Sequence, residues 1–220
     1  YLTNITVQES PEWLRNSLTA IGLVPKNNVV DITNYVMHTF GHPLHAFDAD
    51  QLQGNAVIVR PAKAGETLTT LDEVERTLDP ADMIIADDKG PVCIAGVLGG
   101  LTSGVSQNTK NVYLEGAYFN AVRVRKTAKR HAINSDASYR YERGVDPNIT
   151  AQAHAYALSL MAELAGAEIS PVDLVGAASF PWEEVSFSFQ KVMSLIGLEL
   201  SADTVDLILK QLDFKILAVN

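Results

Sequence analysis

Several features that mark secreted or membrane proteins are missing from this sequence. Its 220 residues include one cysteine, Cys93, which excludes an internal disulfide and fits a reducing compartment. No apolar run approaches the roughly 18 residues that a membrane span needs. The start, YLTNITVQES, lacks the charged and apolar stretches of a signal peptide. We therefore expect a cytoplasmic protein with no membrane partner. The absence of a starting methionine suggests a piece of a longer chain.

Patterns for common cofactor sites are missing too. The sequence has no CxxC or HExxH pair for zinc, no GxxxxGK[ST] loop and no GxGxxG fingerprint. His42 and His45 stand three residues apart in GHPLHAFDAD, but Pro43 favours a turn over a helical ligand pair. The other histidines are distant and Cys93 is alone. We therefore predict no metal site, and a free-standing metallohydrolase fails on ligand count.

The charge is acidic as a whole and basic in one segment. The net charge is −9, yet residues 120–145 hold seven Lys and Arg against two acidic residues, a local charge of +5. Salt screens distant charges beyond roughly 10 Å, so this segment could still bind a polyanion. A solvated helix face or internal ion pairing is the other interpretation.

Periodicity and end signals predict an α+β fold, in which a strand-rich module is packed with helices. Helices are expected at 10–22, with Ser10 as N-cap; at 29–41, with Asp31 or Thr33 as cap; at 120–135; and at 146–166. Trp13, Leu14, Leu18 and Ile21 should pack inward. Strands are expected at 56–62, 82–88, 91–100 and 111–119. We expect one domain over 1–175, a linker at 176–185, and over 186–220 the start of a second domain with two helices and a strand.

A few polar residues could carry chemistry. His45 is a candidate general base, with Asp48 able to hold its ring, although a buried histidine satisfied by the backbone is equally compatible. Thr33 and Asn34 offer donors in a predicted turn or helix entry. Glu115 lies in the apolar run NVYLEGAYF. It is either an exposed edge residue or a buried carboxylate that needs a donor. Gly96, in a glycine-rich run, favours a close backbone approach.

Several segments together resemble one family. SPEWL, VVDITNYVMHTFGHPLHAFDAD, AGVLGG, NVYLEGAYF and SDASYRYERGVDP are similar, in order and spacing, to the central editing module of bacterial phenylalanyl-tRNA synthetase beta subunits. The match spans roughly residues 1–175. The tail resembles the start of the next beta-subunit domain, a small winged-helix-like module.

The resemblance implies an enzyme of two alpha and two beta chains. The alpha chain would charge tRNA(Phe) with phenylalanine using ATP and Mg, and no cofactor is expected on this piece. The beta module would hydrolyse tyrosine wrongly esterified to that tRNA. A hydrophobic pocket cannot strongly reject a substrate that only adds a hydroxyl, so a second site that binds the hydroxyl is needed. We expect no DNA partner.

Residue roles follow from the same resemblance. Glu115 matches the glutamate that accepts the tyrosine hydroxyl. His45 and Pro43 match the pocket wall, and Thr33 and Asn34 the group near the substrate's ester. The remaining matches are Gly96, which leaves room for the aromatic ring; Ala137 on the pocket floor; and Ser135, where threonine is expected. From the basic segment, and not from the resemblance, we expect the tRNA acceptor end to be guided by Arg123, Arg125, Lys129 and Arg130. A non-catalytic module that only positions RNA, with a degenerate pocket, is the alternative.

Overall fold

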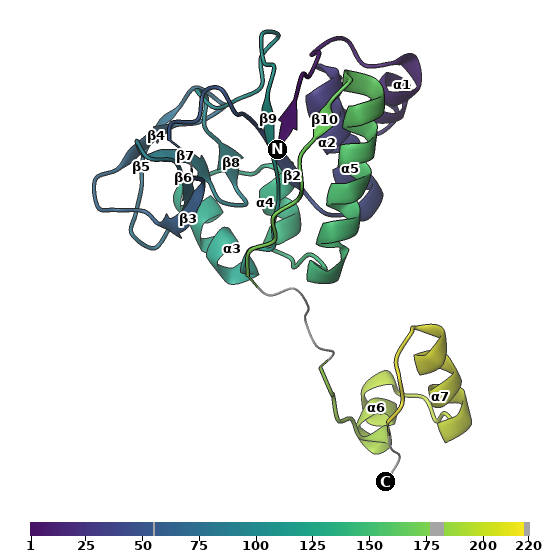
Figure 1. Cartoon of the computed structure of the whole chain (residues 1–220). Coiled ribbons are helices and arrows are strands. Elements are labelled where there is room, and N and C mark those ends of the chain that lie inside the picture. Colours follow the sequence, from purple (N-terminus) through teal and green to yellow (C-terminus); the bar gives the residue numbers. More distant parts are fainter. Residues whose placement is uncertain (55, 177–182, 218–220) are drawn as a thin grey trace. The chain divides into compact units, whose positions relative to one another are not determined.

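The computed structural model describes residues 1–54, 56–176 and 183–217. The chain divides into two units, Tyr1–Phe180 and Pro181–Asn220 (Figure 1). The larger unit combines helices with antiparallel sheets, which confirms the predicted α+β class. The proposed identity of the two domains and of the linker stays a prediction.

A four-stranded antiparallel sheet forms the centre of the larger unit. Its strand order is β10-β1-β9-β2, and its strands are β1 (Leu2–Thr3), β2 (Leu44–Asp48), β9 (Val112–Gly116) and β10 (Glu168–Ile169). β2 and β9 pair along five residues, from Leu44 opposite Gly116 to Asp48 opposite Val112. The longest pairing in this sheet therefore joins segments about 70 residues apart in the chain.

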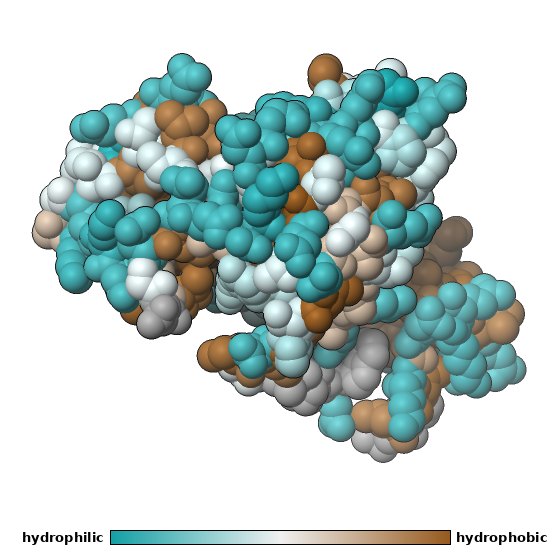
Figure 2. Space-filling model, turned by 45° about the horizontal axis from the view of Figure 1, so that its top comes forward, coloured by the Kyte–Doolittle hydropathy of each residue, from teal (hydrophilic) through white to brown (hydrophobic). Residues whose placement is uncertain are grey.

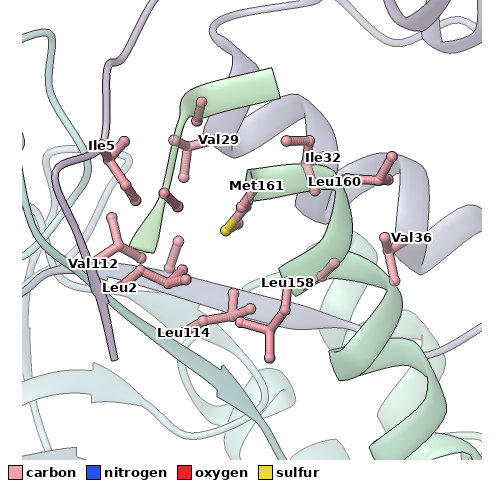
Figure 3. Packing of buried hydrophobic residues seen from close by; sticks show 14 of the residues in the cluster. Leu2, Ile5, Val29, Ile32, Val36, Val112, Leu114, Leu158, Leu160 and Met161 are labelled. Atoms are coloured by element: carbon pink, nitrogen blue, oxygen red, sulfur yellow. The ribbon is translucent and has the colours of Figure 1, made fainter. Parts of the chain in front are cut away.

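Three helices pack beside this sheet and build the main core. They are α1 (Glu12–Ala20), α2 (Asn28–Phe40) and α5 (Thr150–Ala165). Val29, Ile32 and Val36 recur at helical spacing on α2, so they share one face and are fully buried. Figure 3 shows these side chains pointing toward Leu158, Leu160 and Met161 of α5, with Leu2, Val112 and Leu114 of the sheet close by.

A second layer of strands carries the remaining helices. One sheet has the order β3-β6-β7-β8, with β3 (Ile58–Pro61), β6 (Met83–Ala86), β7 (Pro91–Ile94) and β8 (Leu98–Gly99). A two-stranded sheet joins β4 (Thr67–Thr69) to β5 (Glu75–Thr77). Against these pack α3 (Ala121–Arg130) and α4 (Asp136–Tyr141), through Val124, Ala128 and Tyr141.

Helix ends were predicted better at the C-terminal side than at the N-terminal side. Gly41 and Gly166 end α2 and α5 in the left-handed conformation, as expected. The N-cap of α1 is Pro11, because the Ser10 hydroxyl donates to Asp31 instead. Asn27 caps α2, so Thr33 and Asn34 lie inside the helix and not at its entry.

Two apolar residues of α1 do not pack inward as predicted. Leu14 and Leu18 are buried, but Trp13 is 44% and Ile21 52% exposed. Figure 2 shows that hydrophobic and hydrophilic residues are intermixed on one face of the molecule. Isolated apolar residues on a surface are ordinary, so this exposure needs no partner.

The smaller unit holds two capped helices. They are α6 (Phe189–Ile196) and α7 (Ala202–Gln211), with Ser188 and Ser201 as N-caps and Gly197 ending α6. The predicted strand after α7 does not form over 214–217, and 218–220 lie outside the described residues. The short 3-10 turn Pro147–Ile149, capped by Asp146, precedes α5 in the larger unit.

Candidate functional site

The pairing of β2 with β9 places two candidate residues directly opposite one another. His45 on β2 is the register partner of Glu115 on β9. Opposed residues of an antiparallel pair point to the same face, with their Cβ atoms about 4.5–5.5 Å apart. The sheet therefore brings together the proposed base and the proposed hydroxyl acceptor.

The imidazole of His45 sits in an apolar, close-packed setting. Its ring lies edge-on to Phe47, with centroids 4.4 Å apart, and its Nε2 is buried without a hydrogen-bond partner among the described residues. A Cβ added to Gly99 would fall 2.5 Å from His45 Cε1, so a larger residue at position 99 would displace the His45 ring. Burial lowers the pKa of His45 to about 4. The ring is therefore neutral at physiological pH.

Asp48 does not orient His45, contrary to the prediction. The Asp48 carboxylate accepts from the Thr109 hydroxyl at 2.5 Å and from the backbone N–H of Asp50 at 3.1 Å. His45 and Asp48 lie on the same strand but three positions apart, so their side chains point to opposite faces of the sheet. Asp48 instead ties β2 to the loop before β9.

The side chain of Glu115 is half-buried. Its side chain accepts no hydrogen bond from any described residue, and burial raises its pKa to about 7. Burial, and then the charge of Glu115, raise the pKa of both Cys93 and Tyr141, so this carboxyl lies near both. Glu115 is half-buried and its strand β9 lies between β1 and β2, so the interpretation as an exposed edge residue is wrong.

The backbone turn at Gly96 approaches two aromatic rings of the protein itself. Gly96 has φ +68°, and an added Cβ would lie 2.8 Å from Phe119 and 3.2 Å from Tyr141. The Tyr141 hydroxyl is 2.9 Å from the Ala117 carbonyl oxygen and 3.1 Å from that of Pro43. The direction that a side chain at Gly96 would take is thus occupied by Phe119 and Tyr141, and the role of Gly96 beside a substrate ring stays a prediction.

Helix α4 begins beside this turn. Ser135 is its N-cap: the hydroxyl accepts from the N–H of Ser138 at 3.0 Å and donates to the Val97 carbonyl at 2.5 Å. Ala137 packs against the cluster that contains Val97 and Tyr141. The hydroxyl expected at position 135 therefore serves the fold, by holding α4 to the turn between β7 and β8.

The pair Thr33 and Asn34 lies on α2, which packs against β2. The Thr33 hydroxyl is buried and donates to the Val30 carbonyl at 2.8 Å, so it has only acceptor capacity left. The half-buried Asn34 side chain bonds to no other described residue. One turn further, His38 Nδ1 lies 3.2 Å from Arg140 of α4, which brings α2 and α4 together.

The four basic candidates on α3 lie in two kinds of surroundings. Arg123, Arg125 and Lys129 are exposed and form no ion pair within the described part of the chain. Arg130 instead pairs with Asp82, a buried carboxylate. Asp82 also accepts from Thr127 at 2.9 Å and lies 2.7 Å from His131 Nε2. Arg130 is therefore committed to the fold, as the ion-pairing interpretation required.

Two ring-bearing residues near the site, Tyr141 and His42, were given no functional role from the sequence. Tyr141 links Pro43 and Ala117, and His42 packs edge-on to it, with ring centroids 6.2 Å apart. His42 is fully buried, and its ring lies near the Ala117 carbonyl without a well-aligned hydrogen bond. A buried histidine next to proline was visible in the motif, but its partner is about 100 residues away.

The described residues assemble no site for a metal. Within the described residues, no three His, Cys, Asp or Glu side chains come close enough to share an ion. Across the same part of the chain, none of the helices combines the length and the apolar content that crossing a bilayer requires.

Comparison with known proteins decides the family. The model of the B3/4 domain matches residues 1–166. The chain belongs to the B3/4 domain family. It is 49% identical over 215 residues to the phenylalanine--tRNA ligase beta subunit of Bacteroides fragilis, covering 97% of this chain and 26% of that protein. It is 43% identical over 220 residues to the beta subunit of Lactiplantibacillus plantarum, covering all of this chain and 27% of that protein.

The resemblance noted from the motifs is therefore confirmed. This B3/4 chain spans about a quarter of the length of the curated relatives that it matches. Among solved structures, an N-terminal fragment of the Pyrococcus horikoshii phenylalanyl-tRNA synthetase beta subunit is similar with a TM-score of 0.42 and 15% identity, covering 92% of this chain and 57% of that one.

Proposed function

We propose that this chain is the editing module of a phenylalanine--tRNA ligase beta subunit, and that it hydrolyses the ester of tyrosine mischarged on tRNA(Phe). The observation that carries the proposal is the opposed pair on β2 and β9. His45 and Glu115 share one face; the Nε2 of His45 is buried without a hydrogen-bond partner, and no described residue donates to the half-buried Glu115. Unpaired buried polar groups are rare in folded proteins, and ligand sites are where they are expected.

Glu115 accounts for the choice of substrate. The tyrosine hydroxyl would donate to its carboxylate, whereas phenylalanine would leave that carboxylate unpaired in an apolar setting. A hydrogen bond to a charged acceptor contributes about 1.5–3 kcal/mol, which is roughly 10- to 150-fold in rate ratio. The pKa of about 7 makes this selectivity depend on pH, because only the ionised form is a purely accepting group.

His45 would act at the ester end as a neutral hydrogen-bonding group. A base with a pKa of about 4 removes protons from water weakly at neutral pH. We therefore assign His45 to positioning the attacking group, together with Asn34, and Thr33 to accepting a hydrogen bond. The attacking group would be a water molecule. In the alternative, a ribose hydroxyl of the tRNA would assist the attack.

The other functions of the longer protein lie outside this chain. We propose that it works with an alpha subunit in an assembly of two alpha and two beta chains in the cytoplasm. The alpha chain would bind ATP and Mg for charging. The exposed cations Arg123, Arg125 and Lys129 would face the tRNA acceptor end.

One observation favours a second function, an RNA-positioning module without hydrolysis. Phe119 and Tyr141 occupy the space beside Gly96, which reduces the room for a substrate ring. An assay of this chain on Tyr-tRNA(Phe) and Phe-tRNA(Phe), in which deacylation is measured as the release of labelled amino acid, distinguishes editing from RNA positioning. Faster release of tyrosine supports editing. Binding without release from either tRNA supports positioning.

A further inference from the structure

The strand that carries His45 lies at the edge of its sheet. β2 is the last strand in the order β10-β1-β9-β2, so its register within this sheet depends on β9. A slip of one residue would turn every side chain of β2 to the other face and would separate His45 from Glu115. Contacts at the two ends of the β2–β9 ladder therefore decide how these two side chains are placed.

The far end of the ladder, where Asp48 stands opposite Val112, is fixed by polar contacts. The Asp48 N–H donates to the Ser103 carbonyl at 2.9 Å, and the Asp48 carboxylate accepts from the Thr109 hydroxyl at 2.5 Å. Asp48 and Thr109 are both buried. These contacts anchor β2 three positions away from His45, with the Asp48 side chain on the opposite face of the sheet.

The near end of the ladder is held by the phenol of Tyr141. By the register of the two strands, Pro43 stands opposite Ala117, one pair beyond the last that the ladder forms. Pro43 has no N–H, so it cannot donate a further ladder hydrogen bond. The Tyr141 hydroxyl reaches both strands at this point, because it lies 3.1 Å from the Pro43 carbonyl oxygen and 2.9 Å from that of Ala117.

Tyr141 is itself firmly placed. It is the last residue of α4 and is 3% exposed, and its ring packs edge-on against Phe119 with centroids 5.1 Å apart. Burial, and then the charge of Glu115, raise the pKa of Tyr141 well above its usual range. The phenol therefore keeps its proton, remains a hydrogen-bond donor and lies close to Glu115.

The alternation of side chains relates the near end to the candidate site. Pro43 and His45 are two positions apart on β2, and Ala117 and Glu115 are two positions apart on β9, so each pair shares a face of the sheet. We propose that Tyr141 is a positioning residue for substrate selection, whose hydroxyl fixes the separation of His45 and Glu115 by holding both strands where the ladder ends. The expected effect on deacylation rests on the proposed function, whereas the effect on the ladder does not.

Selection should be sensitive to this separation. A tyrosyl ester would have to reach His45 with its ester end and Glu115 with its hydroxyl, whereas a phenylalanyl ester would use only His45. Tyr141→Phe keeps the ring and removes the hydroxyl, so it should slow the tyrosyl ester more than the phenylalanyl ester. Since a misplacement of about 1 Å can cost roughly 100-fold in rate, the ratio of the two deacylation rates should fall by about fivefold or more.

Thr109→Val is the matched control at the far end. It removes the hydroxyl that holds Asp48 and keeps a branched side chain of similar shape. Both variants should lower the free energy of unfolding in urea, because each leaves a buried acceptor without its donor. Only Tyr141→Phe should change the ratio of deacylation rates, which a general loss of stability would not move. Circular dichroism checks that both variants are folded.

Amide hydrogen exchange of the whole chain measures the ladder without any substrate. Tyr141→Phe should speed exchange at the near end, over 44–46 and 114–116, because the local opening of the strands becomes easier there. Thr109→Val should speed exchange at the far end, over 47–48 and 111–113. Because no tRNA is present, this measurement is independent of hydrolysis.

Three outcomes would overturn the proposal. An unchanged ratio in Tyr141→Phe would leave the hydroxyl with a role in the fold alone. An equal fall of the ratio in Thr109→Val would mean that loosening either end suffices. Unchanged exchange at the near end in Tyr141→Phe would show that the hydroxyl does not hold the strands. If the parent hydrolyses neither ester, the proposed function fails, and faster exchange confined to the near end would still uphold the role of Tyr141 in the ladder.

Discussion

Replacing Glu115 with glutamine should stabilise the protein at alkaline pH. Burial raises the pKa of Glu115 from an ordinary 4.5 to about 7, so the folded state holds a proton that the unfolded chain releases earlier. The contribution of the protonated Glu115 carboxyl to the free energy of unfolding is therefore fully present below about pH 4.5, and it is lost as pH rises through about 7. At 1.36 kcal/mol per pKa unit the full difference is about 3 kcal/mol. Water screening of a partly buried side chain reduces this to about 2–3 kcal/mol.

The assay is urea unfolding followed by circular dichroism at pH 5 and pH 8. We expect the free energy of unfolding of the Glu115→Gln variant, relative to the parent, to rise by about 2–3 kcal/mol between the two pH values. Glu163→Gln removes the same charge from an exposed position on α5 and should show no such rise. If the parent and Glu115→Gln respond identically to pH, the carboxyl is hydrated and the account of the site is wrong.

Three further predictions concern neighbouring residues. His45→Ala should lower the hydrolysis rate by a similar factor at every pH from 6 to 8, because the neutral ring positions the attacking group and does not titrate there. An inflection of the parent's rate near pH 7 should belong to Glu115 and disappear in Glu115→Gln; its persistence there would contradict the assignment. Ser135→Ala should lower the free energy of unfolding by about 0.5–2 kcal/mol in urea, whereas Ser135→Thr should retain the cap. An equal loss of stability in the two variants would refute the capping role. Arg130→Ala should lower the free energy of unfolding by about 1–3 kcal/mol, because Asp82 loses a charged donor; an unchanged unfolding midpoint would return Arg130 to the RNA-facing set.

Local signals predicted the elements well where a single residue type is required. Gly41, Gly166 and Gly197 end helices because a left-handed backbone favours glycine, and that requirement is readable in the sequence. The starts of helices were less certain, since several polar residues compete for each cap. Asp31 or Thr33 was expected to cap α2, but the Asn27 side chain accepts the N–H of Val30 and caps the helix instead.

The site depends on contacts that no local pattern contains. The register that sets His45 opposite Glu115 joins strands about 70 residues apart, and a slip of one residue would turn Glu115 to the other face. The link from Tyr141 to Pro43 spans 98 residues. The local pattern singled out His45 and Glu115 and the resemblance supplied their roles, but their burial, and the approach of Phe119 and Tyr141 to Gly96, follow only from the packed structure.

The most direct test of the central claim is the ratio of deacylation rates on Tyr-tRNA(Phe) and Phe-tRNA(Phe) at pH 8, where Glu115 is ionised. The parent should prefer the tyrosyl ester by roughly 10- to 150-fold. Glu115→Ala should bring the ratio close to one while hydrolysis continues, and Glu115→Gln should keep part of the preference through its amide oxygen. An alanine variant that retains the parent's ratio would show that Glu115 does not read the tyrosine hydroxyl.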